Sequence, residues 1–207
     1  MSNVTDACDR ILACLQKTSS WDAQRFQPGL SREEIEEKSK ELLFPLTPEL
    51  YELYKWRNGN PWSNRFILYN YWMLSLENAL DAYCLRGAFA DIRDLYGYDG
   101  YGKYVSEDDN YFWNRHWFPI FCDRDEHRFW VVTIGQESSS VLDVAPDEHC
   151  IEIYPRLTEM LMAEAECFEK VIELLDGRNC HPDDIGLFPD DERLMNIRHK
   201  HGYKLDL

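Results

Sequence analysis

The side chains with the clearest chemical pattern are three that alternate within one short segment. Asp123, Asp125 and His127 have the spacing of the first ligands in a calcium-binding loop. Such a loop also needs glycine at its sixth position and glutamate at its twelfth, where this chain has Arg128 and Ile134. We therefore expect a solvated hairpin turn here and no calcium site.

Glycine and serine clusters are the next candidates, for phosphate binding and nucleophilic catalysis. Gly97, Gly100 and Gly102 follow the reverse order of the G-x-G-x-x-G pattern, and no compelling strand-turn-helix context surrounds them. The serines at 138–140 are not framed by glycines as in a G-x-S-x-G elbow. Both clusters are typical of loops, so we predict no cofactor site.

Thiols and imidazoles could form a nucleophile-base pair or a metal site. Cys122 precedes Asp123 and Cys150 follows His149, but adjacent residues on a strand point to opposite faces. Two histidines near the carboxyl end are fewer than the three or four ligands that zinc needs. The seven cysteines are an odd number without a C-x-x-C pair. We expect reduced thiols in a cytoplasmic protein, no catalytic residue and no metal.

Carboxylates dominate the charged residues, with 38 acidic and 22 basic side chains and a net charge of −16. This charge disfavours nucleic acid as a partner, because a polyanion is repelled by an acidic surface. A basic protein partner and simple solubility both remain explanations of the charge. A carboxylate pair for hydrolysis also remains open, because spacing in sequence does not fix separation in space.

One predicted helix concentrates this charge. Pro155 introduces a helical pattern over about 156–176, and the stretch from Glu137 to Glu169 has nine acids and one base, which gives −8. Four glutamates lie opposite the apolar side of this helix and are expected to face a partner: Glu159, Glu166, Glu169 and Glu173. Glu164 instead falls inside the apolar arc. It must be paired, extend its carboxylate to solvent, or mark a bend in the helix.

An irregular insert over 96–110 supplies the second candidate interface. Its tyrosines, Tyr98, Tyr101 and Tyr104, alternate with glycines, and Glu107, Asp108 and Asp109 follow them. We expect an exposed loop whose tyrosines are available for contact, whereas most other aromatic residues of the chain are expected in the core.

The elements that must position these residues are clearest between residues 31 and 60. Ser31 and Glu34 form a capping box, so a helix begins there, with Ile35, Leu42 and Leu43 on one face. Phe44-Pro45 is predicted to end it.

A second helix follows directly. Thr47 is its predicted cap and Pro48 suits its first position, while Leu50, Leu53 and Tyr54 form its apolar stripe. Asn58-Gly59 is predicted to end it, because both residues tolerate the left-handed conformation.

The remaining elements complete an α+β pattern. We expect a first helix capped by Thr5, a helix that begins at Ser75 and a short helix over 189–199. Runs of aromatic and β-branched residues predict strands at 65–72, 117–121, 129–134, 141–144 and 150–154. Short connections favour a central, mostly antiparallel twisted sheet of about four to six strands, flanked by N-terminal helices and a long C-terminal helix.

Two segments resemble a known family. The run FPLTPELYELYKWRNG is similar to the opening motif of the SUKH superfamily of fungal cell-wall-assembly regulators and bacterial toxin-immunity proteins, and Trp56, Asn58 and Gly59 carry this match. Trp117 and Pro119, with the hairpin that follows, resemble the family's tryptophan-proline-isoleucine strand. The turn over 123–127 departs from the pattern because it has no glycine.

The length of 207 residues and the absence of a shift in composition predict one SUKH-like domain over 1–207, with an N-terminal helix and connection over 1–30, a core over 31–176 and an extension over 177–207. The resemblance implies a non-catalytic module that binds a protein, and our leading hypothesis is an immunity protein that neutralises a basic toxin domain such as a nuclease. A regulatory scaffold without a toxin partner is the alternative, and a carboxylate-dependent hydrolase is a third. The longest uncharged run, Phe66 to Leu76, is too short for a bilayer, so no membrane association is expected.

Overall fold

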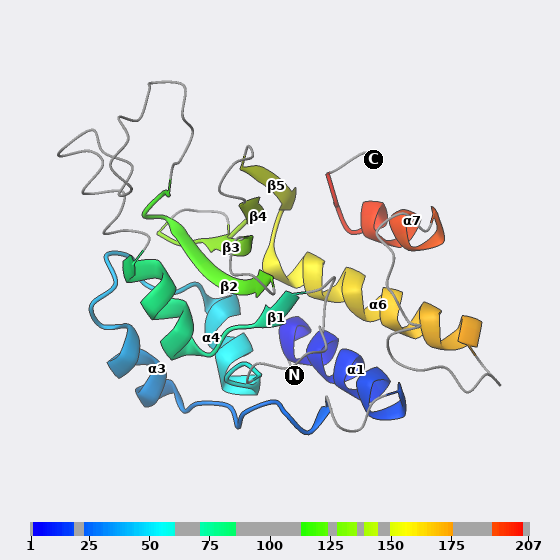
Figure 1. The fold of residues 1–207 in the computed structure, drawn as a ribbon, viewed down its shortest axis with the longest axis horizontal. Helices are drawn as coiled ribbons and strands as arrows, with labels where there is room; N and C mark the ends of the chain where they lie inside the picture. Colours follow the sequence, from blue (N-terminus) through cyan, green and yellow to red (C-terminus); the bar gives the residue numbers. More distant parts are fainter. Residues whose placement is uncertain are drawn as a thin grey trace.

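A computed structural model describes residues 2–18, 23–60, 71–85, 113–123, 128–135, 139–144, 150–175 and 192–204. The fold is α+β, with helices packed on an antiparallel sheet (Figure 1). The helices are α1 (Asn3–Thr18), α3 (Arg32–Ser39), α4 (Pro48–Trp56), α6 (Leu157–Leu175) and α7 (Glu192–Lys200), and residues 76–85 are also helical. This architecture confirms the predicted fold class.

The sheet is a five-stranded meander in which each strand pairs with its neighbours in sequence. Its strands are β1 (Tyr71–Met73), β2 (Trp117–Asp123), β3 (Phe129–Thr133), β4 (Val141–Val144) and β5 (Ile151–Tyr154), and their order is β1-β2-β3-β4-β5. All described pairings are antiparallel. Four strands lie where the sequence predicts them. The first predicted strand falls mostly on residues 61–70, outside the described residues.

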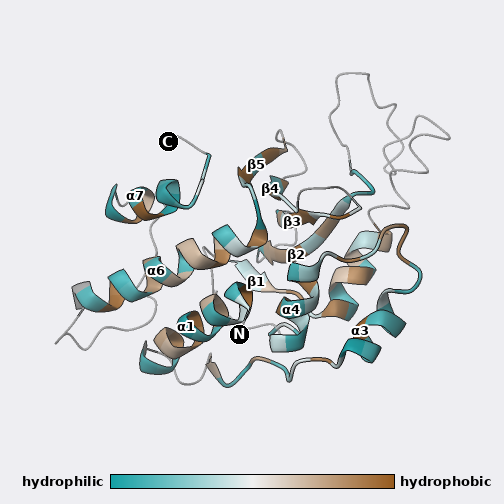
Figure 2. Cartoon of the chain, turned by 180° about the vertical axis from the view of Figure 1, so that it is seen from behind, coloured by the Kyte–Doolittle hydropathy of each residue, from teal (hydrophilic) through white to brown (hydrophobic). Residues whose placement is uncertain are grey.

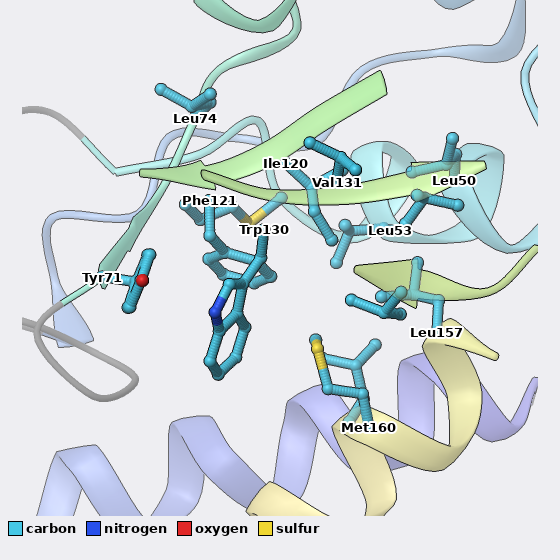
Figure 3. Packing of buried hydrophobic residues seen from close by; sticks show 14 of the residues in the cluster. Leu50, Leu53, Tyr71, Leu74, Ile120, Phe121, Trp130, Val131, Leu157 and Met160 are labelled. Carbon is cyan, nitrogen blue, oxygen red and sulfur yellow. The ribbon is translucent and has the colours of Figure 1, made fainter. Parts of the chain in front are cut away.

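Buried aromatic and aliphatic side chains join the sheet to the helices. Trp130 stacks on Tyr71 with ring centroids 4.8 Å apart and meets Phe121 edge-on. Figure 3 shows Trp130 on the side of the sheet toward which Leu157 and Met160 extend from α6. Aromatic pairs of this kind stabilise a core beyond the area that they bury.

Most strands are brown in the hydropathy colouring of Figure 2, whereas α3 is almost wholly teal. This difference agrees with the burial of every residue of β3 and of only Ile35 on α3. No described helix combines the length and the low charge needed to cross a bilayer.

Local capping chemistry determines where α3 and α4 begin. The Ser31 hydroxyl accepts from the Glu34 N–H, and the Glu34 carboxylate accepts from the Ser31 N–H, so the predicted capping box is confirmed. Thr47 caps α4, and Pro48 occupies its first turn, as predicted. Leu50, Leu53 and Tyr54 form its buried face.

Helix boundaries differ from the prediction at the end of α4, which is Trp56 in place of Asn58-Gly59, at the end of α3 and at the start of α1. The predicted end of α3 at Phe44-Pro45 is wrong, because α3 ends at Ser39 and Leu43 is 61% exposed. The Ser39 hydroxyl donates to the Ile35 carbonyl, and such back-bonding weakens a helix that has little packing to extend it. Thr5 is not the cap of α1: the helix begins at Asn3, and the Thr5 N–H donates to the Ser2 hydroxyl.

Candidate functional site

The four predicted interface glutamates lie on α6, which packs between α1 and α7 (Figure 1). Glu169 faces α1, where Arg10 donates to both of its carboxylate oxygens at 2.8 and 2.7 Å. This bidentate pair lowers the pKa of Glu169 below its ordinary value. The carboxylate therefore links two helices in addition to carrying charge.

Glu166 faces the other neighbour, α7. Lys200 Nζ lies 2.9 Å from one of its oxygens and His201 Nε2 lies 2.9 Å from the other. Burial alone would raise the pKa of Glu166, but the hydrogen bonds from these two residues bring it below the ordinary value.

The remaining two glutamates pair within or next to their own helix. Glu159 accepts from Arg156, and Glu173 accepts from Lys170 at 2.7 Å. Glu173 is the most exposed of the four, with 66% of its side chain accessible. The structure thus places all four acids on α6, each beside a cation of this chain.

Glu164 is fully buried, and its inward position is explained by pairing. Arg198 of α7 donates from Nε to Oε1 at 3.2 Å and from Nη2 to Oε2 at 3.5 Å, and the Tyr154 hydroxyl donates to Oε1 at 3.3 Å. Burial raises the pKa of Glu164 and lowers that of Arg198, since each charge has left water. The sequence left three explanations for Glu164: pairing, extension to solvent or a bend in the helix. The structure shows pairing.

Asn58 connects three segments through one buried amide. Its Oδ1 accepts from the N–H of Leu76, the first helical residue of 76–85, at 2.8 Å. Its Nδ2 donates to Glu77 at 3.1 Å and to Gln27 at 3.4 Å. Helix α4 already ends at Trp56, with Arg57 extended, so Asn58 acts mainly as a cap for the following helix.

Gly59 has a positive φ of 77° and closely approaches the segment before that helix. A Cβ at this position would lie 2.5 Å from Ser75 N and 2.7 Å from the carbonyl carbon of Leu74. Glycine is required on both counts.

Trp56 and Trp117 anchor the ends of the two family-like segments. The Trp56 indole donates to Asp9 of α1 at 2.8 Å and meets Phe26 edge-on. Trp117 is buried beside Trp113, and the pairing register shifts between Pro119 and Phe121, where a proline within a strand is tolerated.

The loop candidates lie outside the described residues. They are Tyr98, Tyr101, Tyr104, Glu107, Asp108 and Asp109, and the same holds for Asp125, His127, His149 and the glycines of the 96–110 insert. Within the described part of the chain, no group of three or more histidine, cysteine, aspartate or glutamate side chains could hold a metal ion.

Sequence reasoning missed two polar positions that organise the fold. Arg198 was not identified as the partner of Glu164, because 34 residues separate them. Glu49 was also missed, although its carboxylate accepts from the Thr158 N–H at 3.0 Å and from the hydroxyls of Thr158 and Ser139. A glutamate in the first turn of a helix is too common to signal such a role.

Comparison with models of known protein families identifies the family of this chain. The model of the SMI1/KNR4 family (SUKH-1) matches residues 29–163, well over half of the chain. No curated protein sequence matches significantly. The matched region contains the capped helices α3 and α4, Asn58 and Gly59, and the whole described sheet. The chain therefore belongs to the SMI1/KNR4 (SUKH-1) family.

Proposed function

We propose that this chain is a non-catalytic protein-interaction module of the immunity type, which binds a cognate toxin domain and blocks its active site. The observation that carries the proposal is the family match over residues 29–163, and the net charge of −16 supports a basic partner. Complementary charge accelerates association and favours one class of partner. A basic nuclease domain is the partner class that fits this charge.

The proposed interface combines the α6 glutamates with the tyrosines and acids of the 96–110 insert. Glu169 and Glu173 are the more exposed of the four glutamates, at 44% and 66% of the side chain. Local cations partly neutralise each glutamate, so long-range attraction comes from the net charge of the chain. Tyrosines of the insert would then supply contact area, as aromatic residues do at the centres of interfaces.

Charge reversal at matched positions tests this proposal. Glu173→Lys changes the proposed face, while Glu37→Lys on α3 makes the same change in net charge at a similarly exposed glutamate that pairs with Lys40. The partner is obtained by affinity capture from the native host and identified by mass spectrometry. Its association rate is then measured at about 50 and 150 mM salt.

We expect Glu173→Lys to slow association by ~3- to 10-fold at low salt and Glu37→Lys to slow it less. An association rate that does not change with salt would contradict electrostatic steering. Equal effects of the two variants would contradict the α6 face as the interface.

A regulatory scaffold without a toxin is the second candidate. The matched family belongs to the superfamily that Trp56, Asn58 and Gly59 resemble, and that superfamily includes cell-wall-assembly regulators as well as immunity proteins. Gene neighbourhood separates the two. A neighbouring reading frame that ends in a variable toxin domain favours immunity, whereas an isolated gene favours the scaffold.

A further inference from the structure

The two helices that flank α6 are held in different ways. Six apolar residues of α1 are buried: Val4, Ala7, Cys8, Ile11, Cys14 and Leu15. On α7 the buried residues are Leu194 and Arg198, and Ile197 is partly buried. Because burial of apolar surface supplies most of the free energy of packing, α1 is part of the core and α7 is weakly anchored by comparison.

Charged contacts hold the segment over 192–204 instead. Arg198 pairs with Glu164, Lys200 and His201 pair with Glu166, and Lys204 pairs with Glu152 of β5. Three acids of α6 and β5 thus receive four basic side chains from one short segment.

The same segment also contacts β5, the last strand in the order of the described sheet. The Lys204 N–H donates to the Ile153 carbonyl at 3.1 Å, and the Tyr203 ring packs on Tyr154 with centroids 5.2 Å apart. A strand edge with free carbonyl groups is a natural site for an added peptide. Here Lys204 of the same chain takes up one of these carbonyl groups, that of Ile153.

A buried ion pair makes this docking specific without making it strong. Removing only Arg198 leaves the buried Glu164 carboxylate without its cation, which is costly. When the whole segment leaves, both charges return to water, and the lost attraction is largely offset by hydration. The segment is therefore suited to reversible docking.

We infer that the β5 edge with Glu152, Glu164 and Glu166 is a docking surface for a basic, arginine-bearing segment of a protein partner, and that residues 192–204 occupy it as an internal ligand. The inference rests on the proposed function, since it assumes that the chain binds a basic protein. The covering segment lies outside the family match, which ends at residue 163, whereas β5 lies within it.

Hydrogen exchange on full-length variants tests whether the segment is separately held. Arg198→Met removes the buried pair, and Arg10→Met is the matched control, since Arg10 also pairs with a glutamate of α6. We expect amide exchange over 192–204 to accelerate by ~100-fold or more in Arg198→Met. Exchange of α1 should change by less than about tenfold in Arg10→Met, because its apolar contacts remain. Unchanged exchange over 192–204 would overturn the inference.

A peptide in trans tests whether the surface accepts a separate basic segment. The probe is a synthetic peptide of residues 192–204, added to the Arg198→Met protein. We expect binding that is at least ~100-fold tighter than binding to the wild type, where the internal segment competes. The same peptide with Arg198→Met should bind at least ~10-fold more weakly, because it lacks the partner of Glu164. No binding to the variant protein, or equal binding of both peptides, would overturn the inference.

If Arg198→Met does not fold, the inference is tested by the salt dependence of amide exchange in the wild-type protein. Between about 50 mM and 1 M NaCl, exchange over 192–204 should accelerate severalfold relative to α1, since the pairs of Lys200 and Lys204 are exposed to screening. Equal responses of the two helices would overturn the inference. None of these measurements uses a toxin, so their failure leaves the proposed function intact. If a captured partner binds Arg198→Met no more tightly than the wild type, the docking surface is wrong and the binding function stands.

Discussion

Asn58 is suited to its position because one short amide side chain supplies both an acceptor and donors. The acceptor satisfies the Leu76 N–H, and the donors reach Glu77 and Gln27. Aspartate would keep the acceptor but place a second carboxylate beside Glu77. Because a buried polar group without a partner is destabilising, this dual role explains an asparagine at the position better than helix termination does.

The carboxylate of Glu77 makes the stability contributed by this cap depend on pH. Burial alone would raise its pKa, but hydrogen bonds from Lys38, Asn58 and its own backbone lower it from 4.5 to about 2. The folded state therefore favours the charged carboxylate, and this contribution to stability is present above pH 4.5 and lost as the pH falls toward 2.

We predict that Glu77→Gln has a flatter dependence of unfolding free energy on pH than the wild type between pH 4.5 and 2. Urea denaturation at several pH values measures it. The control is Glu173→Gln, which removes an exposed carboxylate paired with Lys170. A Glu77→Gln curve that runs parallel to the wild-type curve would show that the cap does not favour the charged form.

Gly59→Ala should be much more destabilising than Gly202→Ala. Both glycines have positive φ, at 77° and 87°, so both substitutions carry the left-handed penalty. At Gly59 the new Cβ would also lie 2.5 Å from Ser75 N, whereas at Gly202 the nearest atom is Pro155 Cδ at 3.1 Å. We expect losses of ~2–5 kcal/mol for Gly59→Ala and less than about 1 kcal/mol for Gly202→Ala, measured by urea denaturation. Similar losses would mean that the backbone near Ser75 yields easily.

At the scale of elements, the sequence predicts those features that depend on neighbours in the chain. The Ser31 capping box, the Thr47-Pro48 start and the strand positions all follow from spacings of a few residues. The end of α3 does not, because its burial is confined to Ile35 and an apolar residue such as Leu43 need not find a packing partner. Helix ends depend on tertiary contacts that local patterns do not contain.

The candidate site shows the same division. Periodicity correctly places Glu164 toward the interior, and it places the other glutamates of α6 on one helix. The partners of Glu169 and Glu166 were not predictable, because Arg10 lies 159 positions from Glu169 and Lys200 lies 34 from Glu166. Charge pairing across such distances is set by how α1 and α7 pack on α6, and no spacing in the sequence encodes it.

Glu49 joins two elements, since it lies in the first turn of α4 and caps the first turn of α6. We predict that Glu49→Ala destabilises the fold by ~2–3 kcal/mol, because it removes charged hydrogen bonds to Thr158 and Ser139 and a favourable charge at the start of α6. Glu52→Ala on the same helix removes a surface pair with Lys55 and should lower stability by no more than about 0.5 kcal/mol. Chemical denaturation compares them, and equal losses would contradict the bridging role of Glu49.

At the scale of the whole molecule, α1 and α7 lie outside the matched residues 29–163. Both helices pack on α6, and the family match includes only the first part of α6, up to residue 163. Their contacts differ in kind, since α1 adds six apolar residues to the core and α7 adds mainly charge. We propose that α1 unfolds with the sheet, whereas α7 opens on its own.

Two truncations of similar size test this difference. Ile11 of α1 and Leu194 of α7 are both buried, at 4% and 2% exposure, so each substitution by alanine removes comparable apolar volume. Ile11→Ala should lower the global unfolding free energy by ~2–5 kcal/mol, because the cavity lies in the cooperative core. Leu194→Ala should accelerate amide exchange over 192–204 while global stability changes by less than about 1 kcal/mol, since α7 already opens below the global transition. Tryptophan fluorescence during urea denaturation reports the global transition, because Trp117 and Trp130 are buried in the sheet. If Leu194→Ala lowered the global unfolding free energy as much as Ile11→Ala does, α7 would belong to the same cooperative unit as the sheet. In that case α7 would not detach while the rest of the protein stays folded.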